Sequence, residues 1–306
     1  MPNQLMVEIA GLKLPNPTML AAGILGLTGA SLRDAAAKGA GAVVTKSVGL
    51  KPRTGYPNPT VVQVCCGLLN AVGLPNPGVH HFAEEIKELK QSEICVPVIA
   101  SVFGFSAQEF AKAAAIMAKA GADAIELNVS CPHVKETGSE IGQHPKLVAE
   151  VVKEVKKAIN KPTIVKLTPN ATNIVEVAQS AVNAGADAIT AINTVRAMAI
   201  EIETTQPILA NKIGGLSGPA IKPIAVRCVY EIYETINVPI IGCGGVTNWR
   251  DAVEFMLAGA SAVQIGTAIA SEGLDVFKSV TKGIASYLQR KGFRSVKQIV
   301  GLSHRC

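Results

Sequence analysis

The sequence predicts an α/β protein folded as a closed (β/α)8 TIM barrel, and three observations lead to this prediction. Eight short apolar runs recur along the 306 residues, each followed by a segment with apolar residues at helical spacing. The runs are continuous rather than alternating, as expected for parallel strands that are buried on both faces. Several runs are also introduced by nearly identical text. An open, doubly wound sheet is the alternative that these patterns leave open.

The predicted strands cover residues 17–23, 41–47, 97–102, 124–130, 163–169, 188–193, 239–245 and 262–267. Segments such as "AQEFAKAAAIMAKAG" and "NIVEVAQSAVNAG" carry the helical period between them. The repeated text reads "AGADAIE" (120–126), "AGADAIT" (184–190) and "AGASAVQ" (258–264), with an echo in "GAGAVVT" (39–45). Its glycine is typical of a left-handed helix C-cap before a strand. We expect one barrel domain over residues 1–306, a usual length for this architecture.

Two connections are too long for ordinary barrel loops. They contain "GLKPRTGYPNPTVVQVCCGLLNAVGLPNPGV" after the second strand and "TVRAMAIEIETTQPILANKIGGLSGPA" after the sixth. Long stretches without secondary structure in a compact domain are usually functional. Both leave the carboxyl ends of strands, the face on which barrel enzymes build their active sites. The pattern therefore favours an enzyme whose long loops cover the C-terminal face of the strands.

Composition excludes several other classes. Hydrophobic residues make up 48% of the chain, and the net charge of +6 is scattered, without the basic cluster of a nucleic-acid-binding surface. No apolar run is long enough to span a membrane, and the first residues lack a secretion signal. Seven cysteines without a disulfide framework favour a reduced, cytoplasmic protein. No C-x-x-C pair is present, so we expect no metal site and no iron–sulfur cluster in this chain.

Polar side chains and glycines gather where the predicted strands end. They are Lys46, Ser47, Ser101, Asn128, Cys131, Lys166, Asn193, Thr194, Gly244, Gly245, Gly266 and Thr267. The glycines in "GCGGV" and "IGTA" end strands seven and eight, where barrels commonly bind phosphate through backbone N–H groups, and "GGLSG" (214–218) could add a third loop. With two lysines nearby, the pattern predicts a phosphorylated cofactor with an electron-rich ring. A lysine that snorkels to the surface is the alternative for Lys166.

Cys131 stands where the fourth predicted strand gives way to a polar loop. A thiol at such a place can be a nucleophile, a metal ligand, a proton-transfer group or an inert small residue. The residue type alone does not decide between these roles.

The motifs "TKS", "GLLNAVGLPNPG", "ELNVSCP", "VKLTPN", "INT", "PILANKIGGLSGPA", "PIIGCGG" and "IGT" resemble the dihydroorotate dehydrogenases, specifically the soluble class 1B flavin subunit. The similarity runs in order over nearly the whole chain. It implies an FMN-containing barrel that oxidises dihydroorotate to orotate in pyrimidine biosynthesis. It also implies a homodimer, and a partner subunit with FAD and an iron–sulfur cluster that passes electrons to NAD in a heterotetramer. A soluble acceptor in place of the partner is the alternative that the sequence leaves open.

The resemblance assigns site residues by position. The flavin ring and ribityl chain are expected to be lined by Ala22, Lys46, Ser47, Ser101, Asn128, Lys166 and Ile192, and the phosphate to be held by Gly218, Gly244, Gly245, Gly266 and Thr267. Orotate is expected to contact Lys46, Asn70, Ala71, Val72, Gly73, Leu74, Asn128, Asn193 and Thr194. Cys131 matches the catalytic base of the family.

The chain departs from the family pattern at two of these places. His133 stands where the family mostly has asparagine, and Ser101 stands where an asparagine is usual beside the flavin. The motifs "SCPH" and "LTPN" also resemble the flavin barrel of dihydropyrimidine dehydrogenases, which reduce uracil and thymine. A flavin-binding barrel without catalysis is a third hypothesis, against which Cys131 and the two lysines argue.

Overall fold

Eight parallel strands close into a barrel. The computed structural model describes residues 4–92, 94–130 and 141–305. The barrel strands are β3 (Thr18–Leu20), β4 (Ala42–Val44), β7 (Val98–Val102), β8 (Ala124–Asn128), β9 (Thr163–Leu167), β10 (Ala188–Ala191), β15 (Ile240–Cys243) and β16 (Ala260–Ile265). Each overlaps a predicted run, although β16 begins two residues before its run, and β16 pairs with β3 to close the ring. The barrel prediction is confirmed, and the open-sheet alternative is wrong.

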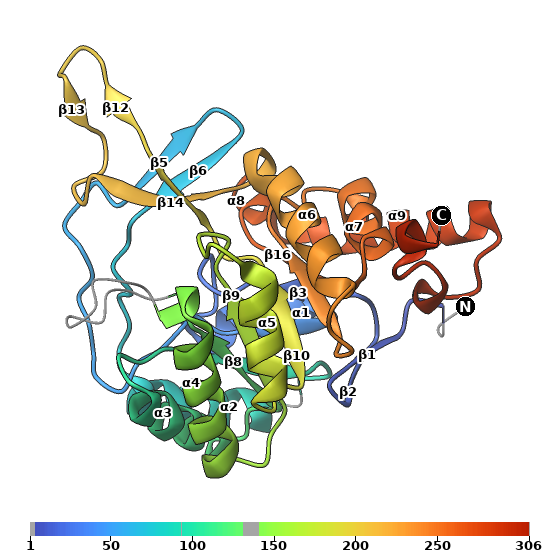
Figure 1. Cartoon of the computed structure of the whole chain (residues 1–306), viewed down its shortest axis with the longest axis horizontal. Helices are drawn as coiled ribbons and strands as arrows, with labels where there is room; N and C mark the ends of the chain where they lie inside the picture. Colours follow the sequence, from blue (N-terminus) through green and yellow to red (C-terminus); the bar gives the residue numbers. More distant parts are fainter. Residues whose placement is uncertain (1–3, 93, 131–140, 306) are drawn as a thin grey trace.

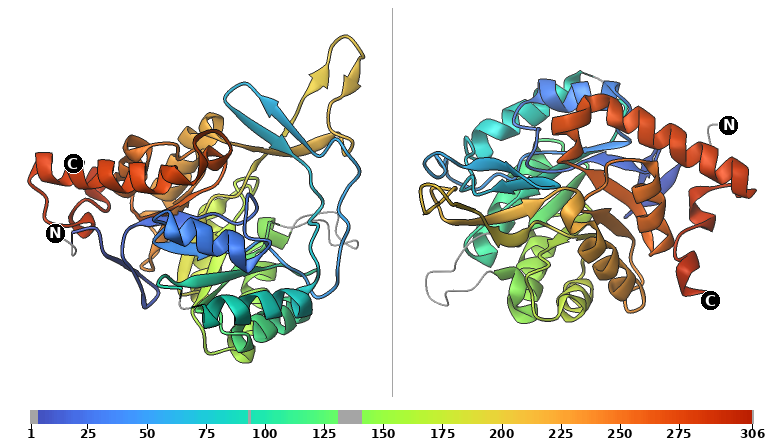
Figure 2. Two further views of the ribbon diagram at one scale, coloured as in Figure 1. Left: turned by 180° about the vertical axis from the view of Figure 1, so that it is seen from behind. Right: turned by 90° about the horizontal axis from the view of Figure 1, so that it is seen from above.

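Helices surround the barrel, as Figure 1 and Figure 2 show. They are α1 (Gly29–Ala37), α2 (Val79–Gln91), α3 (Ala107–Lys119), α4 (Pro145–Ala158), α5 (Ile174–Asn183), α6 (Lys222–Tyr233), α7 (Trp249–Leu257), the short α8 (Ala268–Glu272) and α9 (Val276–Lys291). Buried side chains such as Leu32, Phe110 and Phe255 fill the layer between helices and strands. No helix in the described part of the chain is long and apolar enough to cross a membrane.

A second, smaller core lies inside the barrel. One inward position from nearly every strand contributes to it, including Met19, Ile99, Ile164 and Ile241. The hairpin of β1 (Val7–Ile9) and β2 (Leu12–Leu14) adds Ile9 and Leu14, both fully buried in the same cluster. This hairpin was not predicted from the sequence. It packs against the inner residues and gives the barrel an apolar floor.

The repeated Ala-Gly-Ala-Asp text links neighbouring strands. Asp123 accepts hydrogen bonds from the Val98 backbone N–H at 2.8 Å and from Lys90. Asp187 repeats this arrangement with the Thr163 N–H at 2.8 Å and with Lys156. In each copy the aspartate before one strand therefore satisfies the first N–H of the preceding strand, and the repeats fix the spacing of adjacent βα units.

The two long connections are not structureless, which differs from the prediction. They contain β5 (Val61–Val64), β6 (Gly67–Asn70), β11 (Val195–Met198) and β14 (Ile213–Ser217), which form one antiparallel sheet in the order β11-β14-β6-β5. A further hairpin, β12 (Ile200–Glu201) with β13 (Gln206–Pro207), extends from it. Figure 1 shows both hairpins projecting to one side of the barrel. The segments satisfy their backbone groups by pairing with each other, and we call this sheet the roof.

The loop after β15 is anchored by Asp251 in the first turn of α7. One carboxylate oxygen accepts from the backbone N–H and hydroxyl of Thr247 and from the Asn248 N–H, and the other accepts from Lys222 at 2.8 Å. Burial raises the pKa of this carboxyl, but Lys222 and Thr247 outweigh burial and hold the pKa below its ordinary value of 3.8. The ionised form is therefore the one that the folded protein stabilises.

The Asp251→Asn variant should lower the free energy of unfolding by roughly 1–3 kcal/mol at pH 7, because charge-assisted hydrogen bonds are lost. Because the folded pKa is depressed, this stabilisation is fully present above about pH 4 and disappears as pH falls through the folded pKa. Thermal unfolding of both proteins between pH 3 and pH 7 measures the difference. The control is Glu254→Gln, which removes the exposed partner of Lys222 and should change little. A difference that is independent of pH would contradict the assignment.

Candidate active site

A cavity of about 640 Å³ opens between the carboxyl ends of the barrel strands and the roof. Its size lies in the range of roughly 300–1,000 Å³ that is usual for sites of small ligands and cofactors. It is lined by most of the residues predicted for the site: Ala22, Lys46, Ser47, Asn70, Ala71, Val72, Gly73, Leu74, Asn128, Lys166, Ile192, Asn193, Thr194, Gly218, Gly244, Gly245, Gly266 and Thr267. The fold thus collects both predicted sets, cofactor and substrate, around one space.

One described residue of the predicted set, Ser101, is not on the cavity wall. Ser101 is fully buried behind Ser47, and their hydroxyl oxygens are 2.8 Å apart. It therefore reaches the cavity only through Ser47. Cys131, the predicted base, and His133 lie outside the described residues, and the roles expected for them stay predictions.

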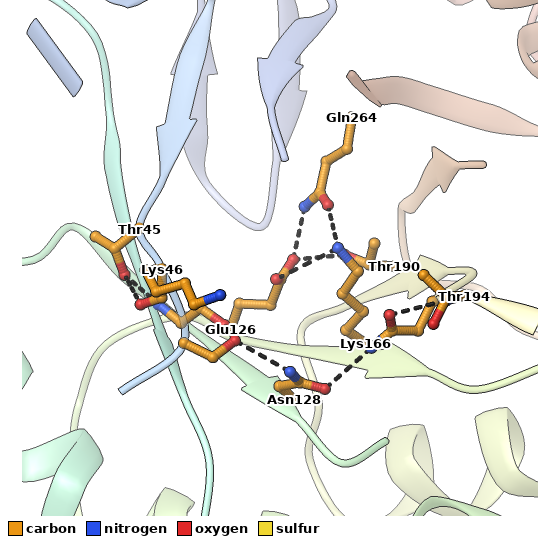
Figure 3. Close-up of polar contacts among 11 residues, drawn as sticks. Thr45, Lys46, Glu126, Asn128, Lys166, Thr190, Thr194 and Gln264 are labelled. Carbon is orange, nitrogen blue, oxygen red and sulfur yellow. Dashed lines mark hydrogen bonds and ion pairs between the residues drawn. The ribbon is translucent and has the colours of Figure 1, made fainter. Parts of the chain in front are cut away.

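A continuous row of polar side chains runs along one wall. The Asn128 amide donates to the Ser47 hydroxyl at 3.0 Å, and the Asn193 amide donates to the Asn128 carbonyl at 3.1 Å. The Thr194 backbone N–H donates to the Asn193 side chain at 2.8 Å. Figure 3 shows Asn128 within this arrangement. These bonds fix which edge of each amide remains for a ligand, so the wall offers both donors and acceptors.

Three loops bring glycines together at another part of the cavity wall. Gly218, Gly244 and Gly245 all have positive φ, of 98°, 127° and 79°. A Cβ on Gly245 would approach the Gly218 carbonyl oxygen to 2.8 Å, and one on Gly218 would approach the Gly67 Cα to 2.9 Å. Side chains are therefore excluded by both backbone conformation and space. Thr267 completes the group, its hydroxyl donating to Ser217 at 2.9 Å. Backbone loops of this kind are suited to hold a phosphate.

The described cavity lining has cationic residues and no carboxylate. Lys46 and Lys166 were predicted, whereas Arg196 and Asn170 were missed although they line the same space. Asn170 accepts from the Arg196 backbone N–H at 2.9 Å and so joins the ends of β9 and β11. The signal was present in the sequence, since Arg196 follows Asn193 and Thr194 in the same strand-end segment. The site is built to attract an anionic ligand.

Lys166 is buried inside the barrel, with only 4% of its surface exposed, so the alternative of a surface lysine is wrong. Its ammonium donates to the Gln264 side-chain oxygen at 2.7 Å and lies 3.9 Å from a Glu126 carboxylate oxygen. Figure 3 shows Gln264 above the two charged groups and joined to both of them. Sequence reasoning missed Glu126 and Gln264. The available signal was the period of two, which puts Glu126 on the same inward face of its strand as Asn128.

No group of three or more potential metal ligands from His, Cys, Asp and Glu occurs in the part of the chain that the structure describes.

Comparison with known proteins identifies the family of this chain. The sequence model of the family described as "Dihydroorotate dehydrogenase" matches residues 4–288. A protein of Pyrococcus furiosus is 52% identical over 98% of this chain and 98% of its own length. Relatives from Methanosarcina acetivorans and Methanocella arvoryzae are 51% and 52% identical over 98% and 96% of this chain, and 96% of each relative is covered. All three are named "Dihydroorotate dehydrogenase B (NAD(+)), catalytic subunit".

These relatives favour dihydroorotate over uracil or thymine as the substrate, so the dihydropyrimidine dehydrogenase alternative is not supported. The resemblance in the sequence motifs, the closed barrel and the full-length similarity all agree. The chain belongs to the dihydroorotate dehydrogenase family, class 1B, and is a flavin-dependent oxidoreductase that oxidises dihydroorotate in pyrimidine biosynthesis.

Proposed function

We propose that the cavity binds FMN and dihydroorotate together, with the phosphate in the glycine loops and the pyrimidine against the row of amides. One observation carries this proposal: a single cavity joins a glycine-lined phosphate site, two lysines and an amide wall. The cofactor part fits the residues present, because Gly218, Gly244 and Gly245 leave no room for side chains and the described lining has no carboxylate that would repel a phosphate.

The substrate part rests on the amides. A pyrimidine presents alternating N–H and C=O groups, and an asparagine side chain offers one donor and one acceptor group. Asn70, Asn128 and Asn193 all line the cavity, and the Asn70 amide also donates to the Gly215 carbonyl of the roof at 3.0 Å. Lys46 provides a cation for the carboxylate of dihydroorotate.

Oxidation of dihydroorotate removes a proton from one ring carbon and a hydride from its neighbour. FMN, when bound, supplies the chemistry that accepts the hydride. We propose that the Cys131 thiolate accepts the proton and becomes a thiol, while Lys46 and the asparagines hold the substrate. A thiolate is required because only the deprotonated sulfur can act as a base.

Anaerobic mixing with substrates tests the proposed function. The purified, FMN-loaded protein should lose its yellow colour with dihydroorotate and keep it with dihydrouracil, since Lys46 has no carboxylate to bind in the second compound. Flavin absorbance in a stopped-flow instrument measures both reactions. Bleaching by dihydrouracil alone would support the dihydropyrimidine dehydrogenase hypothesis. Bleaching by neither would leave a flavin-binding protein without catalysis.

Substitution of Cys131 tests the proposed base. Cys131→Ala should retain FMN but reduce the rate of flavin reduction by dihydroorotate by several decades, on the order of the 10²–10⁴-fold that general bases contribute. Cys131→Ser should lose less, and its rate should recover at high pH as the hydroxyl becomes a better proton acceptor. The control is Cys95→Ala, which replaces an exposed thiol at a distant position on the chain. An unchanged rate in Cys131→Ala would refute the role.

We further propose that electrons leave through a partner subunit that carries FAD and a [2Fe–2S] cluster and reduces NAD, in a heterotetramer built on a homodimer of this chain. The printed names of the relatives, which specify NAD(+) and a catalytic subunit, support a partner. The sequence has no C-x-x-C pair from which this chain could bind its own cluster. The cytoplasmic location and the single-domain organisation expected from the sequence stay predictions.

Purification from the native source tests the partner. The chain should co-purify with a second polypeptide, and the complex should contain iron and FAD in addition to FMN. Iron analysis and flavin chromatography of the complex and of the isolated chain measure this. Purification of the chain alone, with full activity towards a soluble acceptor and no NAD reduction, would contradict the proposal.

A further inference from the structure

A charged pair lies inside the barrel, between its apolar floor and the cavity. Glu126, Thr190 and Gln264 are at most 1% exposed, and Lys166 is 4% exposed. They lie on β8, β10, β16 and β9. Each is two residues after a residue of the smaller core inside the barrel, on the same strand. Taking charges out of water is costly unless they are paired and hydrogen-bonded. The position of this pair directly below a ligand cavity points to a role in function.

Glu126 is connected to the cavity only through its neighbours. Lys166, Gln264 and Cys243 line the cavity, whereas Glu126 and Thr190 do not. One carboxylate oxygen of Glu126 accepts from the Gln264 amide at 2.6 Å and from the Thr190 hydroxyl at 3.1 Å. Gln264 in turn accepts from Lys166 at 2.7 Å. Because a carboxylate accepts and an ammonium donates, the amide of Gln264 has one allowed orientation between them.

The second carboxylate oxygen of Glu126 has no hydrogen-bond partner among the described residues and lies 3.9 Å from the Lys166 nitrogen. The lysine thus donates to a neutral amide in contact, has the Cys243 side chain as a further partner, and lies beyond hydrogen-bonding distance of the carboxylate. A buried oxygen without a partner is costly, and here the nearest cation is Lys166. This geometry suits a counter-charge that holds the lysine without drawing it away from the cavity.

We infer that Glu126 is a positioning residue, which acts through Gln264 to keep Lys166 protonated and fixed beneath the cofactor site. The inference rests on the proposed function, in which a cation near the reduced flavin stabilises its negative charge. Glu126 supplies the negative charge that stabilises the buried ammonium of Lys166. Gln264 holds the two side chains in place through its hydrogen bonds to both. Removal of the carboxylate charge should therefore affect the cofactor although Glu126 does not touch it.

The groups around Lys166 support this assignment. Burial lowers the pKa of the lysine, but Cys243 and Glu126 outweigh burial and raise the pKa above its ordinary value of 10.5. Burial is also the largest cause that raises the pKa of the Cys243 thiol above its ordinary value of 9.0, while Lys166 opposes this rise. Thr190 and Gln264 are neutral, and Lys46 is the other predicted lysine of the same cavity.

The test compares Glu126→Gln, which removes the charge but keeps the shape, with Thr190→Val, which removes one hydrogen bond to the same carboxylate. NMR of ¹⁵N-lysine-labelled, FMN-free protein follows the titration of Lys166, whose signal is assigned by its absence in Lys166→Met. The acid dissociation constant of Lys166 should rise at least tenfold in Glu126→Gln, because the ammonium loses its proton more easily without the carboxylate. The same constant should change less than threefold in Thr190→Val. The double variant Glu126→Gln/Gln264→Glu, which returns a carboxylate to the pair, should restore the original constant.

A second readout uses the FMN-loaded protein. The reduction potential of FMN should fall more steeply with rising pH in Glu126→Gln than in the wild type, because Lys166 loses its proton more readily without the carboxylate. An unchanged Lys166 titration in Glu126→Gln, or an equal shift in Thr190→Val, would overturn the inference. If Glu126→Gln does not fold, Glu126→Asp serves instead, and it should retain most of the lysine's affinity for its proton. Failure of the wild type to bind FMN would refute the proposed function, while the titration of FMN-free protein would still test the pair.

Discussion

Closure of the ring by β16 and β3 is the constraint on which the rest of the structure depends. Val263 pairs with Thr18, Gln264 with Met19 and Ile265 with Leu20, so the last strand of the barrel lies beside the first. Because all eight strands run in one direction, their carboxyl ends form one rim, and residues far apart in the sequence share it. Gln264 can bridge Lys166 and Glu126 only because β16 faces β8 and β9 across the closed interior.

Much of this rim could be predicted because parallel strands that are buried on both faces are recognisable as continuous apolar runs. The residues at the end of each run are the predicted site residues, and nearly all of them line the cavity. Glycines were informative for a related reason. Gly218, Gly244 and Gly245 combine positive φ with close backbone contact, which other residues do not tolerate.

The roof could not be predicted, because its strands are short and their partners lie on another connection. Leu69 pairs with Leu216 across nearly half of the chain, and no local pattern reveals such a pairing. Glu126 was missed for a different reason. Within "AIELN" it resembles an interruption of an apolar strand, and only the alternation with Asn128 shows that it points inward. Ser101 was predicted to line the site, but Ser47 lies between it and the cavity. Only the packing of the side chains decides which of the two hydroxyls reaches the cavity.

The floor has a consequence for the charged pair above it. Ile9 and Leu14 are inaccessible to solvent and belong to the same cluster as the inner residues of the strands. Among the described residues, apolar side chains thus fill the end of the barrel at the hairpin, and the cavity lies at the other end. Of the charged pair, Lys166 lines the cavity and Glu126 lies behind it. A ligand in the cavity would therefore cover the one side of Lys166 that faces open space, so that its size decides how much water stays in contact with the ammonium.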